Sequence, residues 1–314
     1  MIHRRVVLLG PQRLQPTLST AIDSLGIRGR IAAITAGWEE REGEDQELRD
    51  HLGGRTINLA LYERTEDVFR HDQEFMRATR VRHDRVRKMQ ELYRTRLTHM
   101  VKAARELSQR ESTQGYEDLI EPELRGAIDA VRALDDEHVA RMRAADSEFV
   151  SRWRPRDREH VARHIRELRW VLDGCDALCV AGGHVAILLN RMRLFSVLDL
   201  LREQPIIAWS AGAMAISQRV VVFHDRPPQG AGAAEVLESG LGACSGVVPL
   251  PHAEKRLDLG DRARVALFAR RFDPALCVAL DPRTRVDWHE QHWNGQAGTR
   301  CLTSGGELVE VGAR

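Results

Sequence analysis

The chain contains 314 residues, of which 43% are hydrophobic and 30% are charged. This length predicts one large domain or two units, and the composition excludes a fully disordered chain. The formal net charge of +1 argues against a protein that binds nucleic acid or anionic membranes through its overall charge.

Short apolar runs alternate with helical stretches in the first part of the chain. The predicted strands are 5–9, 30–35 and 57–61, and the predicted helices end near residue 25 and span 39–51. This alternation is typical of a parallel sheet with helices on its faces.

Residues 65–155 have a different pattern, with almost no glycine or proline. Apolar residues recur every three or four positions from Met89 to Leu107 and again from Leu124 to Phe149, which predicts two long amphipathic helices. The turn between them is expected within 111–122. The first arm is basic and the second is acidic, which favours an antiparallel hairpin whose flanks pair with each other.

The hairpin is predicted to be an insertion in a single α/β domain. We therefore expect a discontinuous domain of residues 1–64 and 156–314, interrupted by a helical insertion of residues 65–155. Nucleic-acid binding by the basic arm is not favoured, because this arm lacks interleaved aromatic residues and faces an acidic arm. A surface for dimerisation or for docking of a partner is the other interpretation.

The α/β pattern resumes after about residue 158. Predicted helices span 160–172, 183–202 and 211–218, and predicted strands span 177–181 and 205–209. The second of these strands ends at Ser210, which is followed by small residues and a helix-compatible run. A serine on such a tight strand-to-helix turn is a candidate nucleophile, since the turn exposes its hydroxyl group beside backbone N–H groups. An ordinary helix cap is the alternative, because the pattern is Ser-Ala-Gly-Ala rather than Gly-x-Ser-x-Gly.

Two further stretches carry candidate chemistry. Gly182 and Gly183 end a strand before a helix, and such a loop turns N–H groups toward an anion or a developing oxyanion. A tight turn without chemistry is the alternative. His252 lies in a loop rich in glycine and proline, where a catalytic base would be exposed yet held, although a lone loop histidine is more often a surface residue.

In this order, the three motifs resemble the aspartyl dipeptidase (dipeptidase E) and cyanophycinase family of serine peptidases. The resemblance covers 158–290 and, more weakly, 1–62, and it includes the helical stretch 263–268 and the motif Asp281-Pro-Arg-Thr284. It does not cover the helical insertion. The resemblance implies the fold of class I glutamine amidotransferases, a three-layer, doubly wound, mostly parallel sheet of the flavodoxin-like type.

The resemblance also implies a catalytic apparatus. Ser210 corresponds to the nucleophile and His252 to the general base. The N–H groups of Ala211 and of Gly182 or Gly183 correspond to the oxyanion hole. An imidazole removes the hydroxyl proton during attack, and a serine in place of cysteine implies a serine ester as the acyl-enzyme.

The carboxylate that orients the histidine is less well defined. Asp225, fifteen residues after the serine, is the preferred candidate, and Glu235 and Glu238 are the alternatives. Three further residues are candidates for substrate contacts: His184, Trp209 and Arg256.

Two departures from the family pattern affect specificity. Ala181-Gly182-Gly183-His184-Val185 stands where the family has Gly-Gly-Gly-Asn-Thr, and Pro251 precedes the histidine. The three motifs together predict a serine peptidase-like hydrolase that cleaves a small peptide or amide next to an acidic residue, whereas these departures favour the alternative. The alternative is a catalytically inactive or repurposed member of the fold that acts as a binding protein through its helical insertion. A homodimer formed through the insertion is expected.

Other side chains argue against metals, cofactors and membranes. No run approaches about 18 apolar residues, so no transmembrane helix is expected. The five cysteines are scattered with no Cys-x-x-Cys pair, which predicts a cytoplasmic protein without a disulfide framework.

His289 and His292 are three residues apart but lack a third ligand for a metal ion. His160 and His164 lie on an arginine-rich helix and are expected on a solvated face. We predict neither a metal nor a cofactor.

Overall fold

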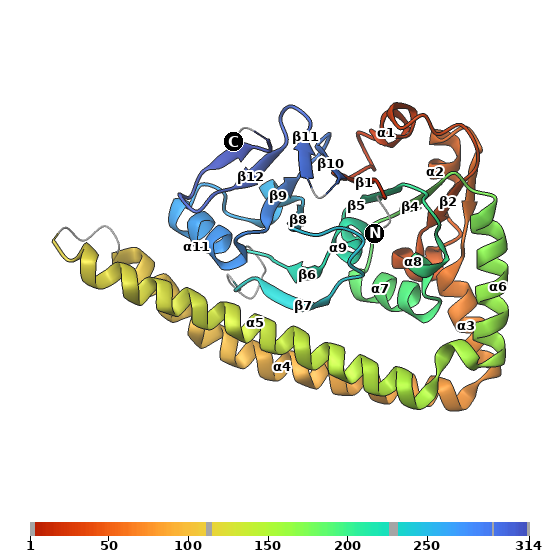
Figure 1. Ribbon diagram of the computed structural model, residues 1–314, viewed down its shortest axis with the longest axis horizontal. Coiled ribbons are helices and arrows are strands. Elements are labelled where there is room, and N and C mark those ends of the chain that lie inside the picture. Colours follow the sequence, from red (N-terminus) through yellow and green to blue (C-terminus); the bar gives the residue numbers. More distant parts are fainter. Residues whose placement is uncertain (1–3, 111–114, 226–231, 291, 313–314) are drawn as a thin grey trace.

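A seven-stranded, mainly parallel sheet lies at the centre of the α/β body (Figure 1). The computed structural model describes residues 4–110, 115–225, 232–290 and 292–312. The strand order is β11-β10-β1-β5-β4-β2-β3. The five parallel strands are β1 (Val6–Leu9), β2 (Ile31–Ile34), β3 (Thr56–Asn58), β4 (Ala177–Val180) and β5 (Ile206–Trp209), and the antiparallel pair is β10 (Arg285–His289) and β11 (His292–Gly295).

Helices cover both faces of this sheet, as the continuous apolar runs predict. All four residues of β1 are buried, and Val7 and Leu9 pack in one apolar cluster with α1 while Val6 and Leu8 pack in another with α6, α7 and α9. The helices and 3-10 turns of this part are α1 (Leu18–Ser24), η1 (Ala36–Arg41), α2 (Gln46–His51), α3 (Leu61–His71), η2 (Pro155–Asp157), α6 (Glu159–Asp173), α7 (Val185–Leu194), α8 (Val197–Leu200) and α9 (Ala211–Ile216). The predicted α/β class is confirmed.

Three predicted elements are divided or shortened by local backbone geometry. The predicted strand 57–61 ends at Asn58, because Ala60 has a φ of 50° and α3 starts at Leu61. The predicted helix 183–202 is broken at Ser196, which has a φ of 49°. The predicted helix 39–51 is divided into a 3-10 turn, which ends at Arg41, and a short helix, which begins at Gln46.

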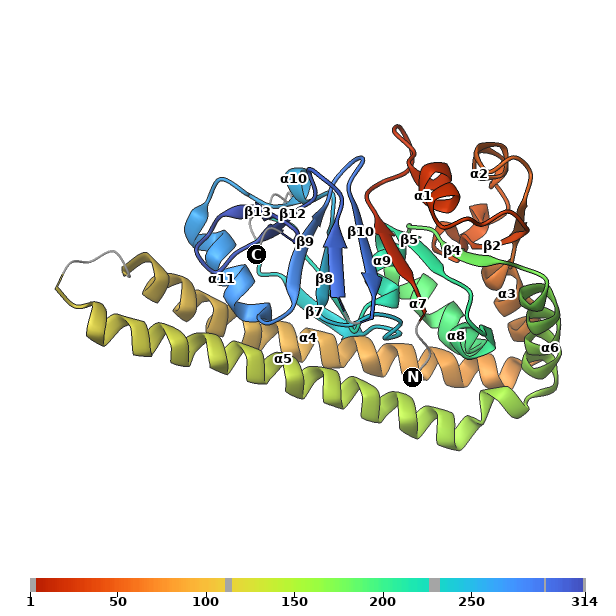
Figure 2. The same ribbon diagram turned by 45° about the horizontal axis from the view of Figure 1, so that its top comes forward.

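The rest of the body forms a second, four-stranded sheet and a two-stranded ribbon (Figure 2). The sheet has the order β13-β12-β9-β8, with β8 and β9 parallel. Its elements and those around it are β6 (Arg219–Val222), β7 (Glu235–Ser239), β8 (Val247–Pro251), α10 (Ala253–Arg256), α11 (Arg262–Phe272), β9 (Leu276–Leu280), β12 (Arg300–Leu302) and β13 (Leu308–Glu310). His252 therefore follows a strand of one sheet, and Ser210 follows a strand of the other.

The long helical hairpin consists of α4 (Gln73–Arg110) and α5 (Glu117–Trp153), which run antiparallel along one side of the body (Figures 1 and 2). The predicted pairing of the basic arm with the acidic arm is present, with ion pairs Arg82–Asp146, Arg85–Glu148 and Arg96–Glu137. The predicted turn is shorter than expected, because α5 begins at Glu117 and includes Pro122. Residues 111–114 of that turn lie outside the described residues.

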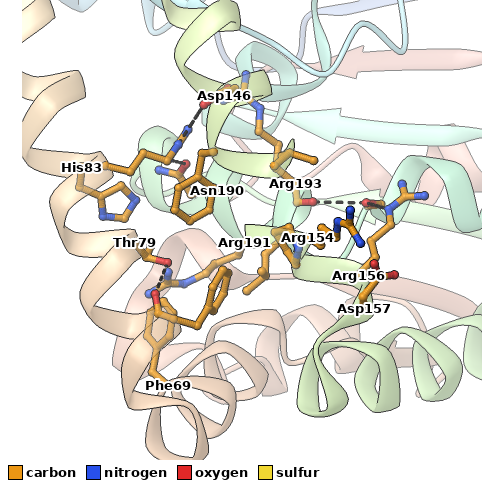
Figure 3. A pocket seen from close by; sticks show the side chains of 17 residues that line it. Phe69, Thr79, His83, Asp146, Arg154, Arg156, Asp157, Asn190, Arg191 and Arg193 are labelled. Atoms are coloured by element: carbon orange, nitrogen blue, oxygen red, sulfur yellow. Dashed lines mark hydrogen bonds and ion pairs between the residues drawn. The ribbon is translucent and has the colours of Figure 1, made fainter. Parts of the chain in front are cut away.

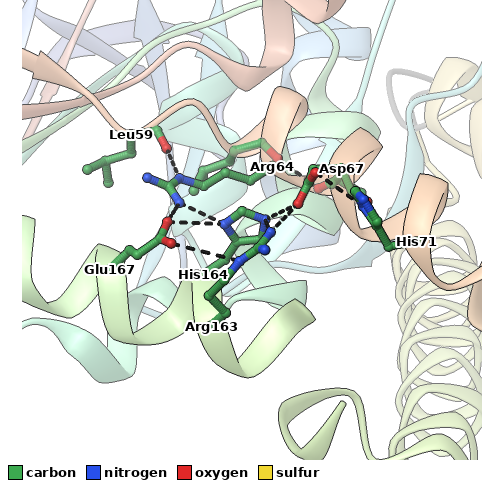
Figure 4. Close-up of polar contacts among 9 residues, drawn as sticks. Leu59, Arg64, Asp67, His71, Arg163, His164 and Glu167 are labelled. Atoms are coloured by element: carbon green, nitrogen blue, oxygen red, sulfur yellow. Dashed lines mark hydrogen bonds and ion pairs between the residues drawn. The ribbon is translucent and has the colours of Figure 1, made fainter. Parts of the chain in front are cut away.

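A polar network joins α3 to α6 (Figure 4). Nη1 of Arg64 lies 2.8 Å from Nδ1 of His164, and Nε2 of the same ring lies 2.8 Å from a carboxylate oxygen of Asp67. His164 is only 6% exposed, so the predicted solvated face was wrong at this position. The reason is tertiary, because α3 covers this face of α6.

Within the described parts of the chain, none of the helices combines the length and the apolar character that crossing a membrane requires.

Candidate active site

Ser210 occupies a strained turn between β5 and α9. β5 ends at Trp209 and α9 begins at Ala211, which leaves a single residue to reverse the chain. Ser210 accordingly has φ 51° and ψ −124°, a conformation that costs a residue with a Cβ about 1–3 kcal/mol. This is the backbone geometry expected for an exposed nucleophile at a strand-to-helix elbow.

Glycines allow the neighbouring chain segments to approach this turn. A Cβ on Gly212 would lie 2.3 Å from the carbonyl oxygen of Val180, at the end of β4. A Cβ on Gly182 would lie 2.8 Å from Cβ of Ser210. The predicted proximity of the paired-glycine loop to the serine is therefore present in the structure.

The paired-glycine loop is held by a residue that sequence reasoning missed. Gly183 has a φ of 112°, and a Cβ there would lie 2.2 Å from the carbonyl oxygen of Gly37. That same carbonyl accepts a hydrogen bond from the amide of His184 at 2.7 Å. The available signal was that Gly37 follows β2, which neighbours β4 in the sheet, because loops after adjacent parallel strands meet at the same edge.

His252 lies at the carboxyl end of β8 in a left-handed conformation, with φ 58° and ψ 41°. Its amide donates to the carbonyl oxygen of Leu280 at 3.0 Å, and its own carbonyl accepts from the amides of Lys255 and Arg256. Burial, followed by the positive charges of Arg256 and Lys255, lowers the pKa of the His252 imidazole. The ring is therefore neutral at pH 7, the state that a general base requires.

One cavity of about 660 Å³ brings most of the predicted site residues together. Its lining includes Trp209, Ser210, Ala211, Gly182, Gly183, His252 and Arg256. The lining also includes charged and aromatic side chains that sequence reasoning missed: Arg13, Trp38, Arg41, Glu44 and Glu47. Arg13 lies in the loop after β1, and the other four lie in the segment from η1 to α2 that follows β2, at the same sheet edge as Ser210.

Arg256 is the cation closest in sequence to the histidine. Its guanidinium carbon lies 6.0 Å from the ring centroid of Phe223, and burial lowers its pKa. It forms no ion pair with any carboxylate of the described residues. The guanidinium therefore remains available to a carboxylate in the cavity.

The three carboxylates predicted for the triad have other partners. Asp225 accepts from Arg264 at 2.5 Å and from the amide of Asp258 at 2.9 Å. Glu235 binds Arg94 and Glu238 binds Arg193. Among the described residues, the imidazole of His252 forms no hydrogen bond with any carboxylate. Sequence distance from the serine could not show this, because it does not determine where a side chain points.

His184 serves as the cap of α7. Its Nδ1 accepts a hydrogen bond from the amide of Ile187 at 3.3 Å, and its side chain is exposed. It is absent from the described lining of the cavity, which includes the neighbouring Gly183 and Val185. A role in capping thus accounts for this residue.

One cluster has ligands suited to a metal ion. Ligand atoms of Asp67, His71 and His160 all lie within 4.8 Å of one another. However, the carboxylate of Asp67 already binds Arg163 and His164, and these groups compete with a cation (Figure 4). The cluster lies on α3 and α6, apart from the residues that line the cavity at Ser210.

No family model and no curated protein sequence matches the chain. Among solved structures, the chain is similar to a peptidase from an acI-B1 Actinobacterium. The two share 14% sequence identity at a TM-score of 0.47, over 98% of this chain and 97% of the other.

Proposed function

We propose that the chain is a serine hydrolase that cleaves an amide bond of a small peptide through an acyl-enzyme. The observation that carries this proposal is the strained backbone of Ser210 within a cavity that also contains His252 and the paired glycines. Strain of this kind persists where the surrounding structure imposes it, and it is concentrated at functional sites.

In the proposed reaction, the neutral imidazole of His252 takes the proton from the Ser210 hydroxyl as the oxygen attacks the carbonyl carbon. The N–H groups of Ala211 and Gly183 donate hydrogen bonds that stabilise the negative charge developing on the carbonyl oxygen. The imidazolium then gives its proton to the leaving amine, and the C–N bond breaks. Water, deprotonated by the same imidazole, hydrolyses the serine ester and restores the enzyme.

Asp225 has an indirect role in this proposal. Its amide donates to the carbonyl oxygen of Arg256 at 2.7 Å, and its carboxylate accepts from the amide of Asp258. These two bonds hold the segment that follows His252. We therefore propose Asp225 as a positioning residue for α10, in place of the third member of a triad.

Arg256 supports a substrate that carries a carboxylate. It is half-buried, it faces the same cavity as Ser210, and it has no ion-pair partner among the described residues. A guanidinium in this state gains a strong, charge-assisted interaction from a substrate carboxylate. This argument favours cleavage next to an acidic residue.

The second candidate function is a binding protein that acts through the hairpin, with a second copy of the chain as one candidate partner. Several large apolar side chains on α4 and α5 are exposed, among them Val81 (69%), Leu92 (56%) and Leu119 (61%). The hairpin contributes no residue to the described lining of the cavity at Ser210. Such a function is therefore compatible with either an active or an inactive cavity.

A fluorophosphonate probe tests the hydrolase proposal. The wild-type chain is expected to become covalently labelled at Ser210, and the Ser210→Ala variant is expected to remain unlabelled. His252→Ala is expected to slow labelling by about 10²- to 10⁴-fold, because the general base is lost. If native wild-type and Ser210→Ala proteins label equally or not at all, the hydrolase proposal fails and the binding function is left.

A further inference from the structure

A second cavity lies between the base of the hairpin and α7 (Figure 3). Its volume is about 670 Å³, comparable with the cavity at Ser210 and within the range of small-molecule sites. Phe69 and Thr79 line it from α3 and α4, Asp146 from α5, and Asn190 and Arg191 from α7. The two cavities share no residue of the described chain.

Aromatic rings form the apolar part of this cavity. Phe75 is only 1% exposed, and its ring centroid lies 6.3 Å from that of Phe69 and 5.8 Å from that of Phe149. Phe69 and Phe149 are half-buried. Three rings at these separations leave edges and faces against which another flat ring can pack.

Arginines dominate the polar part, with five of them against two aspartates in the lining. Four of them pair with a carboxylate: Arg82 and Arg193 with Asp146, Arg156 with Asp199, and Arg191 with Glu66. Glu66 and Asp199 lie outside the lining, so basic groups outnumber acidic groups on the wall of the cavity.

Arg191 is buried, and its guanidinium is not fully hydrogen-bonded. Its side chain is 11% exposed, and its closest carboxylate oxygen, from Glu66, lies 3.3 Å from Nη2. Its Nε is buried and has no hydrogen-bond partner among the described residues. The guanidinium also lies over the rings of Tyr62 and Phe69. A buried donor without a partner is unfavourable, and an anionic group of a ligand would satisfy it.

His83, in the same lining, is a buried imidazole beside two of these arginines. Burial, followed by the charges of Arg82 and Arg191, lowers the pKa of its imidazole to about 4. The ring is therefore neutral at pH 7. A neutral imidazole adds no positive charge, so the arginines are the groups of this wall that attract an anion.

We propose that this cavity binds a small organic anion with an aromatic ring, the acidic group on Arg191 and the ring among Phe69, Phe75 and Phe149. The buried donor accounts for the charge of the ligand, and the phenylalanine cluster accounts for its ring. This site is separate from the proposed hydrolytic reaction and does not depend on it.

Fluorescence titration of the full chain tests the site with two probes. The first is 8-anilinonaphthalene-1-sulfonate, and the second is 1-anilinonaphthalene, which has the same rings without the sulfonate. Arg191→Gln is expected to weaken binding of the sulfonate by about ten- to a hundredfold and to leave binding of the neutral probe unchanged. Arg28→Gln, which removes an arginine that is 81% exposed at the side chain and lines neither cavity, is the matched control and is expected to change neither affinity.

Val150 provides a second test that does not disturb the interior, because this lining residue is 55% exposed. Val150→Glu is expected to weaken binding of the sulfonate, and Val150→Lys is expected to strengthen it, with the neutral probe insensitive to both. The proposal is overturned if Arg191→Gln weakens binding of the sulfonate no more than Arg28→Gln does. It is equally overturned if the two Val150 variants bind the sulfonate alike.

Discussion

The buried ion pair between Asp135 of α5 and Arg271 of α11 is predicted to hold the hairpin on the body. Asp135 is 1% exposed and Arg271 is 6% exposed at the side chain, and two hydrogen bonds of 2.7 Å join them. The hydroxyl of Tyr93 on α4 donates to the same carboxylate at 2.7 Å and accepts from the amide of Val236 on β7 at 3.1 Å. Four elements thus meet in one network of satisfied polar groups.

Asp135→Ala would leave the guanidinium of Arg271 buried with no carboxylate to pair with. Breaking a buried pair in this way costs about 3–5 kcal/mol, which is a large part of the stability of an ordinary domain. We therefore expect the free energy of unfolding to fall by about 3–5 kcal/mol. The measurement is urea denaturation followed by circular dichroism, with the slope of the transition checked for each variant.

Two further variants decide whether burial of the charge is the cause. Glu121→Ala removes an exposed pair on the same helix, with side-chain exposures of 68% for Arg125 and 64% for Glu121, and should cost less than about 1 kcal/mol. The double variant Asp135→Leu with Arg271→Met removes both charges and should recover most of the loss. A loss for Asp135→Ala no greater than that for Glu121→Ala would refute this account of the network.

Three predictions concern the cavity at Ser210 and use the rate of fluorophosphonate labelling. Gly182→Ala places a Cβ 2.8 Å from Cβ of Ser210, so labelling should slow at least tenfold and the free energy of unfolding should fall by about 1–3 kcal/mol. The control is Gly43→Ala, where a Cβ meets nothing within 4 Å, and it should change neither quantity. Because the pKa of His252 is lowered, the labelling rate should reach half its maximum below about pH 6.5. Arg256→Gln should move this midpoint upward, because it removes a positive charge beside the imidazole. A wild-type midpoint above about pH 6.5 would contradict the proposed electrostatics of the site. Asp225→Asn should slow labelling and reduce stability without moving the midpoint, whereas a downward shift would place this carboxylate beside the imidazole after all.

The elements of the body followed from local pattern. Continuous apolar runs predicted buried parallel strands, and the spacing of three and four from Met89 to Phe149 predicted the hairpin arms. Two of the errors fell at Ala60 and Ser196, where a single residue with positive φ ends or divides an element. The others were the predicted helix 39–51, which is η1 and α2, and the solvated face expected at His164. Positive φ at a residue other than glycine is imposed by tertiary packing, so sequence alone does not reveal it.

The candidate site was only partly predictable for the same reason. Ser210 and Gly182 could be found because each directly follows an apolar strand, and parallel strands end at a shared edge. The partner of Asp225 could not be found, since Arg264 is thirty-nine residues away and reaches it through packing of α11.

The spacing of apolar residues along the chain was enough to indicate the parallel sheet, the two helical arms and the serine at a strand end. Three features became visible only in the folded chain: His252 reaches the same cavity from a second sheet, the predicted carboxylates bind other cations, and Arg191 is buried without a full set of hydrogen-bond partners. Periodicity is a property of neighbouring residues, whereas the partner of a charge and the shape of a cavity depend on segments far apart in the chain.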